Sequence, residues 1–155
     1  MRRVELYRLV HSDQTPECQL YLREVEGGRV FPIVISIHEM AEIHRKVHEL
    51  ETRRPMTHDL FRQLLSVRDL TLERVDVTAL EEEVFYARMH FTDAAGEAFE
   101  LDARPSDAVA IATGTGSPVF AADEILDAIG IVEADEPEGG GEAEGTPGDE
   151  RGQNS

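Results

Sequence analysis

The sequence predicts an α+β fold in which a single domain is followed by a disordered acidic tail. Segments that alternate apolar and polar residues, the period of a half-buried strand, occur in both halves of the chain. Segments with apolar residues at the 3.6-residue spacing of a helix lie between and after them. From residue 133 onward the chain has no apolar periodicity and is rich in Glu, Asp, Gly and Pro, so it cannot bury enough surface to fold. We therefore assign residues 1–132 to the domain and 133–155 to the tail.

Three strands are expected in the N-terminal part of the chain. Apolar and polar residues alternate around residues 4–9 and again over residues 18–23. Gly27-Gly28 marks a turn, and residues 30–35 are apolar apart from Pro32. Because proline cannot donate a ladder hydrogen bond, Pro32 places this third strand at a sheet edge or at a bulge.

Two helices are expected to follow. Ser36 and Glu39 stand in the S-x-x-E relation of a capping box, which predicts a helix over about residues 37–51. Helical spacing separates its buried apolar residues from charged residues that face away: Met40, Ile43, Val47 and Leu50 against Glu42, Arg45, Lys46 and Glu49. Thr57 is expected to cap the second helix, which runs to about Val67. The buried stripe of this second helix is predicted to consist of Leu60, Phe61, Leu64 and Leu65.

The C-terminal part is expected to form an antiparallel meander and two more helices. The alternation predicts strands over residues 70–79, 85–91 and 97–102. A slip in the pattern between Leu72 and Val75 indicates a bulge. The next helix begins at Pro105 and Ser106, because proline has no N–H to lose there and serine can cap the free amides. A short strand at residues 118–120 and a helix at residues 123–129 complete the domain.

Composition and charge narrow the functional classes. The chain has 155 residues, a single cysteine and no apolar run near the roughly 20 residues of a membrane span. It begins without the apolar core of a signal peptide, so we expect a cytoplasmic protein with no membrane role. The net charge is −17, of which −10 falls on residues 1–132. Because such a domain repels phosphates at long range, a role on nucleic acid requires a local basic patch, a metal ion or both.

The first candidate site lies in the segment that ends with Thr57-His58-Asp59, at the start of the second helix. Thr57 and Asp59 have structural explanations, as a cap and as a negative charge favoured by the helix dipole. His58 stands next to Asp59, and a carboxylate can hold an imidazole as a general base or metal ligand. The alternative is a surface histidine on a helix start, which the spacing alone favours.

The second candidate site is the turn that contains Asp102, Arg104, Ser106 and Asp107. In a functional interpretation, Asp102 and Asp107 bind a divalent cation while Arg104 binds a phosphate, since hard cations prefer oxygen ligands and a guanidinium fits a phosphate. In a structural interpretation, Asp102 and Arg104 form an ion pair that braces the turn, with Ser106 and Asp107 as caps. Two carboxylates and an arginine exceed what capping requires, so both interpretations stay open.

Four segments, taken together, resemble the bifunctional nuclease domain family. They are Phe31-Pro32-Ile33-Val34-Ile35, Arg54-Pro55-Met56-Thr57-His58-Asp59-Leu60, Phe85-Tyr86-Ala87 and Asp102-Ala103-Arg104-Pro105-Ser106-Asp107-Ala108. Their order and spacing agree with the family over about residues 4–130. The resemblance implies an α+β domain with a mixed, mostly antiparallel sheet and packed helices, self-association into a homo-oligomer, and nuclease activity on DNA and RNA.

The resemblance carries over only to matching motif positions. These are Arg54, Thr57, His58 and Asp59 in one block and Asp102, Arg104, Ser106 and Asp107 in the other. Two positions depart from the family pattern: Ser36 replaces a glycine and Gly114 replaces an arginine. The loss of an arginine at position 114 weakens the case for phosphate binding.

Two functions follow as hypotheses. The first is a phosphodiesterase acting on DNA or RNA, in which both blocks share one cleft. His58 would act as general base, or Asp59, Asp102 and Asp107 would hold a divalent cation such as Mg²⁺ or Ca²⁺; the groups expected to bind phosphate are Arg54, Arg104 and Ser106. The alternative is a non-catalytic regulatory or assembly module acting through protein partners or self-association, in which both turns are ion-paired braces.

Overall fold

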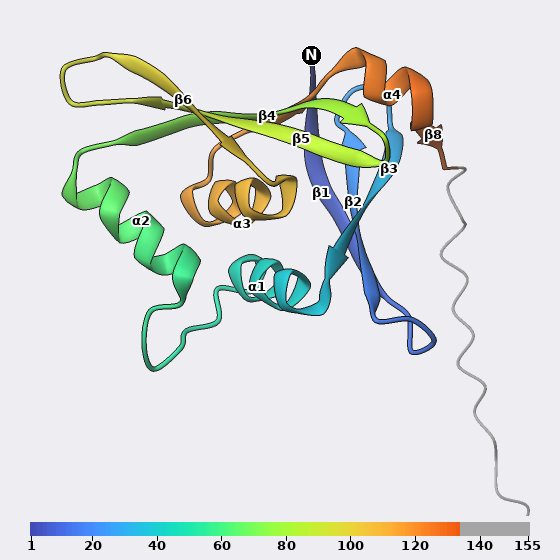
Figure 1. Ribbon diagram of the computed structural model, residues 1–155, viewed down its shortest axis with the longest axis horizontal. Coiled ribbons are helices and arrows are strands. Elements are labelled where there is room, and N and C mark those ends of the chain that lie inside the picture. The colour runs from blue at the N-terminus through green and yellow to red at the C-terminus, as the bar shows by residue number, and fades with distance from the viewer. Residues whose placement is uncertain (134–155) are drawn as a thin grey trace, which may run out of the picture.

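The computed structural model describes residues 1–133, so the predicted disordered tail lies, from residue 134 on, outside the described residues. In chain order the elements are β1 (Arg2–His11), β2 (Glu17–Glu24), β3 (Arg29–Ser36), α1 (Ile37–Val47), α2 (Thr57–Val67), β4 (Thr71–Glu81), β5 (Val84–Thr92), β6 (Ala98–Ala103), α3 (Pro105–Thr115), β7 (Val119–Ala121), α4 (Asp123–Ile129) and β8 (Ile131–Val132) (Figure 1). The predicted α+β fold is confirmed. No helix within residues 1–133 has the length and apolar character needed to cross a membrane.

All the strands of residues 1–133 form one mixed sheet in the order β6-β5-β4-β7-β1-β2-β3-β8. Neighbouring strands are antiparallel except β4 and β7, which are parallel. Two meanders of three strands, β1-β2-β3 and β4-β5-β6, lie on either side of β7, and each leads into a helix, α1 or α3. The two halves of the domain therefore repeat one arrangement, and the helices α1 and α3 meet between them (Figure 1).

The core lies between the curved sheet and the helices. The sheet curls so strongly that Phe31 on β3 stacks on Phe85 on β5, with ring centroids 6.0 Å apart, although β4, β7, β1 and β2 separate these strands. Helix α3 is buried on nearly all sides, because its middle consists of the small and apolar residues 108–112. Because α3 is buried, the position of its N-terminus is fixed in the fold. The second candidate site lies at this N-terminus.

Local signals placed most strand and helix boundaries correctly. The capping box is confirmed, since Ser36 accepts from the Glu39 N–H (3.3 Å) and Glu39 accepts from the Ser36 N–H (2.6 Å). The bulge is confirmed by a register shift between Leu72 and Arg74. Pro32 lies on β3 beyond its pairing with β8, which contacts only residues 29–30, as expected for an edge position. The short strand β8 was not predicted.

Two predicted N-caps are wrong. The N-cap of α2 is Met56, whose N–H donates to the Asp59 carboxylate (2.9 Å), and Thr57 is the first helical residue. The N-cap of α3 is Arg104, because Pro105 already occupies the first helical position, where its fixed φ suits a helix. The Ser106 hydroxyl is therefore free to bond elsewhere.

The predicted faces of α1 and α2 also need correction. Glu42 and Lys46, expected to face away from the core, are buried because α1 packs against α3 and the Asp59 side chain of α2 reaches Lys46. On α2 only Leu65 of the predicted stripe is fully buried, at 6% exposure. Phe61 is partly buried, whereas Leu60 and Leu64 are 62% and 53% exposed. Apolar residues thus lie on both sides of α2.

The β4–β5 hairpin stores strain in its two-residue turn. Glu82 and Glu83 have φ values of 48° and 66°, a left-handed conformation that favours Asn and Gly. We expect the double substitution Glu82→Asn with Glu83→Gly to raise the free energy of unfolding by about 1 kcal/mol, or the melting temperature by about 2–4 °C. Thermal melts by circular dichroism measure this. Glu82→Ala, which keeps the strain, serves as the control, and a lower melting temperature in the double variant would contradict the expectation.

Candidate functional site

The starts of α2 and α3 lie side by side. His58 Nε2 on the first turn of α2 is 2.9 Å from Asp107 Oδ1 on the first turn of α3. Arg104, the N-cap of α3, donates from Nε to the other Asp107 oxygen, Oδ2 (2.8 Å). Both blocks singled out in the sequence therefore contribute to one cluster, although 49 residues separate His58 from Asp107.

The start of α1 also contributes to the cluster, through the Glu39 side chain. Its Oε1 accepts from the Ser106 hydroxyl (2.8 Å) and from Arg104 Nη1 (2.7 Å). Its Oε2 remains bonded to the Ser36 N–H at the N-cap of α1. Glu39 thus links the two helix starts that the repeated halves of the fold bring together. Ser106 is not a cap but a donor to this carboxylate.

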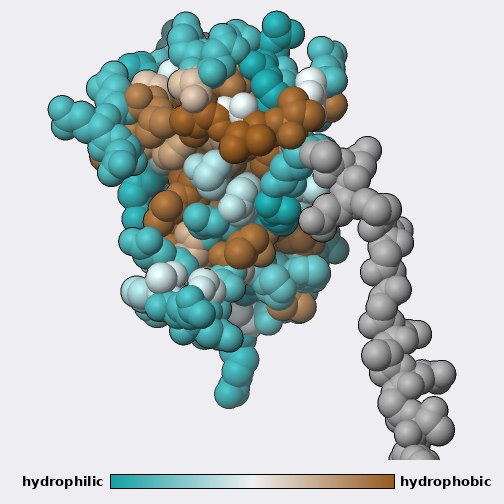
Figure 2. Space-filling view, turned by 90° about the vertical axis from the view of Figure 1, so that its right-hand side faces the viewer, coloured by the Kyte–Doolittle hydropathy of each residue, from teal (hydrophilic) through white to brown (hydrophobic). Residues whose placement is uncertain are grey.

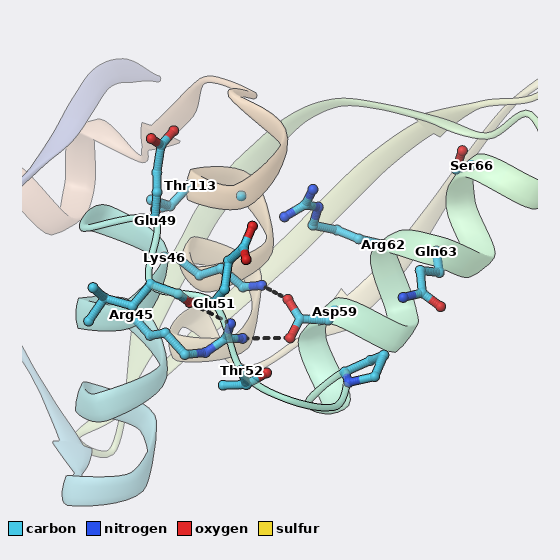
Figure 3. A pocket seen from close by; sticks show the side chains of 13 residues that line it. Arg45, Lys46, Glu49, Glu51, Thr52, Asp59, Arg62, Gln63, Ser66 and Thr113 are labelled. Atoms are coloured by element: carbon cyan, nitrogen blue, oxygen red, sulfur yellow. Dashed lines mark hydrogen bonds and ion pairs between the residues drawn. The ribbon is translucent and has the colours of Figure 1, made fainter.

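A second set of ion pairs continues the cluster along α1 to Asp59. Asp59 accepts from Lys46 Nζ and from Arg45 Nη2 (2.8 Å), as Figure 3 shows. Arg45 also donates to Glu42 Oε1 (2.6 Å), and Lys46 Nζ is 3.7 Å from the same oxygen. The Lys46 side chain is only 5% exposed, so its ammonium depends on these carboxylates for compensation.

Three carboxylates of the cluster, those of Asp107, Asp59 and Glu39, have lowered pKa values that favour the ionised form. Burial raises the pKa of Asp107, but hydrogen bonds from Arg104 and His58 outweigh it and hold that pKa below its usual value. Burial also raises the pKa of Asp59, yet the hydrogen bonds from Lys46 and the Met56 N–H, with both nearby cations, lower it to about 2. The Glu39 pKa is lowered in the same way, because the Ser36 N–H and Ser106 hydroxyl donate to it against the effect of burial.

His58 lies between two carboxylates. Its Nε2 faces Asp107, and its Nδ1 is 3.7 Å from Glu42 Oε1, beyond hydrogen-bond distance. A neutral imidazole donates from one nitrogen only, so donation to Asp107 from Nε2 leaves the lone pair on Nδ1. The arrangement brings an imidazole and a carboxylate into the direct contact of an Asp–His pair.

Two predicted residues lie outside this cluster. Along β6 the side chains alternate between faces, and Ala103 packs towards α3. Asp102 therefore points to the opposite face, where Glu100 pairs with Arg88 (2.9 Å). Arg54 is exposed in the loop between α1 and α2, and its side chain forms no ion pair within residues 1–133. The suggested Asp102–Arg104 brace is wrong, since Arg104 pairs with Glu39 and Asp107 instead.

The predicted metal ligands do not fit a shared cation. Asp102 points to the face of the sheet away from α3, the helix that carries Asp107, and both Asp107 oxygens are already bonded, to His58 and to Arg104. Within the described part of the chain, no group of three or more His, Cys, Asp or Glu residues is arranged to hold a metal ion.

Sequence reasoning missed the contribution of α1. Glu39 was explained by the capping box alone, and three residues of the charged cluster were assigned to the solvent face: Glu42, Arg45 and Lys46. Their signal was the i, i+3 and i, i+4 spacing of opposite charges, which permits ion pairs on one helix. The spacing did not reveal that the Asp59 carboxylate on α2 would pair with Arg45 and Lys46.

An open depression of about 810 Å³ adjoins the Asp59 end of the cluster. Its walls come from the C-terminal half of α1, the loop after it, α2 and the end of α3 (Figure 3). The Arg62 side chain extends from α2 into this depression. A Cβ atom at Gly114 would lie 3.0 Å from Arg62 Cδ, so the glycine leaves the room that Arg62 occupies. A guanidinium thus lies beside position 114 although that position has no arginine.

Comparison with known proteins agrees with this architecture. The model of the bifunctional nuclease domain matches residues 20–134. Uncharacterized proteins from two strains of Mycobacterium tuberculosis, CDC 1551 and H37Rv, are 38% identical over 117 residues, which cover 76% of this chain and 69% of theirs. The match includes both blocks that form the cluster, so the chain belongs to the bifunctional nuclease domain family.

Proposed function

We propose that this protein hydrolyses phosphodiester bonds of nucleic acid at the cluster formed by His58, Asp107 and Arg104. The observation that carries the proposal is the 2.9 Å contact between His58 and Asp107, beside a guanidinium whose side chain is 67% exposed. A base held by an acid, next to an accessible cation, is what attack on a phosphodiester requires. Membership of the nuclease family supports the same reaction class.

Each group has a defined task in this proposal. Asp107 accepts a hydrogen bond from the Nε2–H of His58, which leaves the Nδ1 lone pair to take a proton from the attacking water as its oxygen bonds to phosphorus. The bond from phosphorus to the leaving ester oxygen breaks, and that oxygen receives a proton from solvent. Arg104 uses Nε and Nη1 for Asp107 and Glu39, so its Nη2 is directed to the phosphate, where it stabilises the developing charge.

The same groups explain how so acidic a domain binds a polyanion. Arg104 presents its guanidinium at the cluster, and Arg62 presents one in the depression that Asp59 also lines. We suggest that phosphates contact these two arginines in succession. The proposal assigns no protein ligands to a divalent cation, because Asp102 and Asp107 face apart. A divalent cation takes part only when it is bound to the phosphates of the substrate.

The test is cleavage of labelled single-stranded and duplex DNA and RNA, with Mg²⁺, with Ca²⁺ and with a chelator. We expect His58→Gln and Asp107→Asn each to lower the cleavage rate at least about 100-fold, the usual contribution of acid–base groups. Asp102→Asn, on the far face of the sheet, is the matched control and should keep the wild-type rate. Equal rates in His58→Gln and Asp102→Asn would reject the assigned roles.

One observation favours a second candidate, a non-catalytic assembly module. Each charged side chain of the cluster is engaged by another, and His58 is only 17% exposed. In a module of this kind the cluster would join the two halves of the domain and perform no chemistry. Wild-type protein would then cleave no substrate under any metal condition, and His58→Gln would change only the stability.

A further inference from the structure

Strand β1 is paired along the whole of one edge but only along part of the other. On one edge it pairs with β2 through residues 4–11, whereas on the other it pairs with the short strand β7 through residues 2–4 alone. No other strand of residues 1–133 pairs with residues 5–11 on that second edge, and in Figure 1 the β1–β2 hairpin projects well beyond β4 and β5. We call this stretch, residues 5–11 on the side of β7, the open edge of β1.

The burial of the side chains agrees with an open edge. On β2 the residues that point into the core, Cys18, Leu20 and Leu22, are 0% exposed. On β1, Leu6 and Leu9 pack against the same core but stay partly exposed, although β1 lies between β7 and β2 in the sheet. The core is therefore not closed on the side of β1 that β7 leaves uncovered.

A cavity of about 420 Å³ lies at the start of the open edge. It is bounded by β1, β2, the C-terminal half of α3 and residues 117–119, and its aliphatic lining includes Val4, Leu6, Leu22, Val109 and Val119. On an added strand, the residue opposite Leu6 would face the same side of the sheet as Leu6. An aliphatic side chain at that position would therefore lie at this cavity.

The residue before Leu6 favours a basic partner. Glu5 faces the other side of the sheet, where it accepts from Arg23 Nη2 on β2 (2.7 Å) and remains 48% exposed. A lysine or arginine directly opposite Glu5 on an added strand would form a cross-strand ion pair with it. The net charge of −17 adds a long-range attraction for a basic segment.

We propose that an extended segment of another protein binds along the open edge of β1 as an added strand. The segment runs antiparallel to β1, in line with β7, and carries an aliphatic residue opposite Leu6 followed directly by a lysine or arginine opposite Glu5. Hydrogen bonds to the backbone of β1 provide affinity, while the cavity and Glu5 select the side chains. The proposal goes beyond the nuclease function and does not depend on it.

The surroundings of the open edge favour a single segment over the edge of another folded sheet. Helix α3 and residues 117–119 flank its start, so they would collide with a folded domain whose own strand approached Leu6. A register shift between Leu6 and Arg8 marks a bulge in β1, and bulges hinder the edge-to-edge pairing of two sheets. A flexible segment can enter the same space and follow the bulge.

The outer edge of β3 is less suited to an added strand. Val34 on β3 is 58% exposed, and Ile131 and Val132 on β8 are each 67% exposed. Figure 2, which views the molecule from the right-hand side of Figure 1, shows a band of apolar side chains across that face. Strand β8 covers only residues 29–30 of β3, but Pro32 follows and has no N–H to donate to another strand.

The outer edge of β6 is also less suited. This strand ends the sheet, and its side chains include the exposed carboxylates of Glu100 and Asp102. Charged side chains on an edge strand oppose the addition of a further strand. We therefore assign the added strand to β1.

The test begins with random peptides of about seven residues, displayed on phage and selected against the full chain. We expect the selected peptides to contain an aliphatic residue followed directly by lysine or arginine. One such peptide is synthesised with a fluorescent label, and fluorescence anisotropy measures its affinity. Binding should slow hydrogen exchange of backbone N–H groups within residues 5–11, because an added strand protects those that face the open edge.

A reversal of charge tests the contact with Glu5. Glu5→Lys should weaken binding of the selected peptide about 10-fold, because it replaces a cross-strand attraction by a repulsion. A peptide with glutamate in place of its basic residue should bind Glu5→Lys more tightly than it binds the wild type. Glu97→Lys, which makes the same change of charge at an exposed position between β5 and β6, is the matched control and should bind the selected peptide as the wild type does. Circular dichroism confirms that each variant is folded.

Three results would overturn the proposal. A selection that enriches no peptide would show that the open edge does not bind extended segments. Slower exchange within residues 31–36 instead of residues 5–11 would place the added strand on β3. Equal weakening by Glu5→Lys and Glu97→Lys would show that the overall charge, and not a residue opposite Glu5, determines the affinity.

Discussion

Replacing Asp59 by asparagine is expected to lower the free energy of unfolding by about 3 kcal/mol, the low end for breaking a buried ion pair. The substitution keeps the shape of the side chain but removes the negative charge that Lys46 and Arg45 share. The Lys46 side chain is 5% exposed and would keep only Glu42, at 3.7 Å, as a nearby carboxylate. Urea unfolding at pH 7, followed by circular dichroism, measures the loss.

Acid should remove the same contribution from the wild-type protein. The Asp59 pKa is lowered from 3.8 to about 2 in the folded state, because the Lys46 and Met56 hydrogen bonds outweigh burial. A folded pKa below the unfolded one means that the stabilisation is complete above about pH 4 and is lost as the pH falls towards 2. The difference between wild type and Asp59→Asn should shrink across this window. An undiminished difference at pH 2 would show that the carboxylate charge is not its source.

Removing the buried charge together with its partner supplies the control. In the double variant Asp59→Asn with Lys46→Met, no buried ammonium is left, so most of the lost stability should return. If the double variant is as unstable as Asp59→Asn alone, the loss comes from the capping hydrogen bond to the Met56 N–H rather than from Lys46.

Phe91→Ala should lower the free energy of unfolding further, by about 4 kcal/mol. Phe91 on β5 is 1% exposed and packs against Phe99 on β6 and Phe61 on α2. Removing the Phe91 ring opens a cavity where α2 packs against the sheet, so we expect α2 and His58 on it to be displaced as well. Chemical unfolding gives the stability, and the partly exposed Phe99→Ala, expected to cost about half as much, gives the comparison. Equal losses of unfolding free energy in the two variants would show that the greater burial of Phe91 does not determine the size of the effect.

Features that depend on neighbouring residues could be predicted from the sequence. Ser36 and Glu39 lie within one helical turn, so the capping box was visible in the pattern. The second role of Glu39 was not visible, because its partner Ser106 lies 67 residues away. Only the folded sheet, with its two repeated halves, determines that α1 and α3 begin at the same place.

The strand period in the sequence already separates Asp102 from the cluster. Leu101 and Ala103 face the helices, so the two-residue period of a strand already directs Asp102 to the other face. Asp107 follows the turn into α3, where the helical period applies instead. The change of period at the turn therefore separates two acids that stand only five positions apart in the sequence. The outward apolar side of α2 was missed for a different reason, since a sequence stripe does not show which side the domain itself covers.

The repetition of one strand–strand–strand–helix unit has a consequence for how the cluster could arise. Glu39 and Glu42 come from the first unit, and Arg104 and Asp107 from the second. Neither unit possesses a complete set of charges, so the cluster exists only where both are joined. Either unit produced as a separate fragment would lack the complete cluster, and mixing the fragments would restore the cluster only as far as their helices dock.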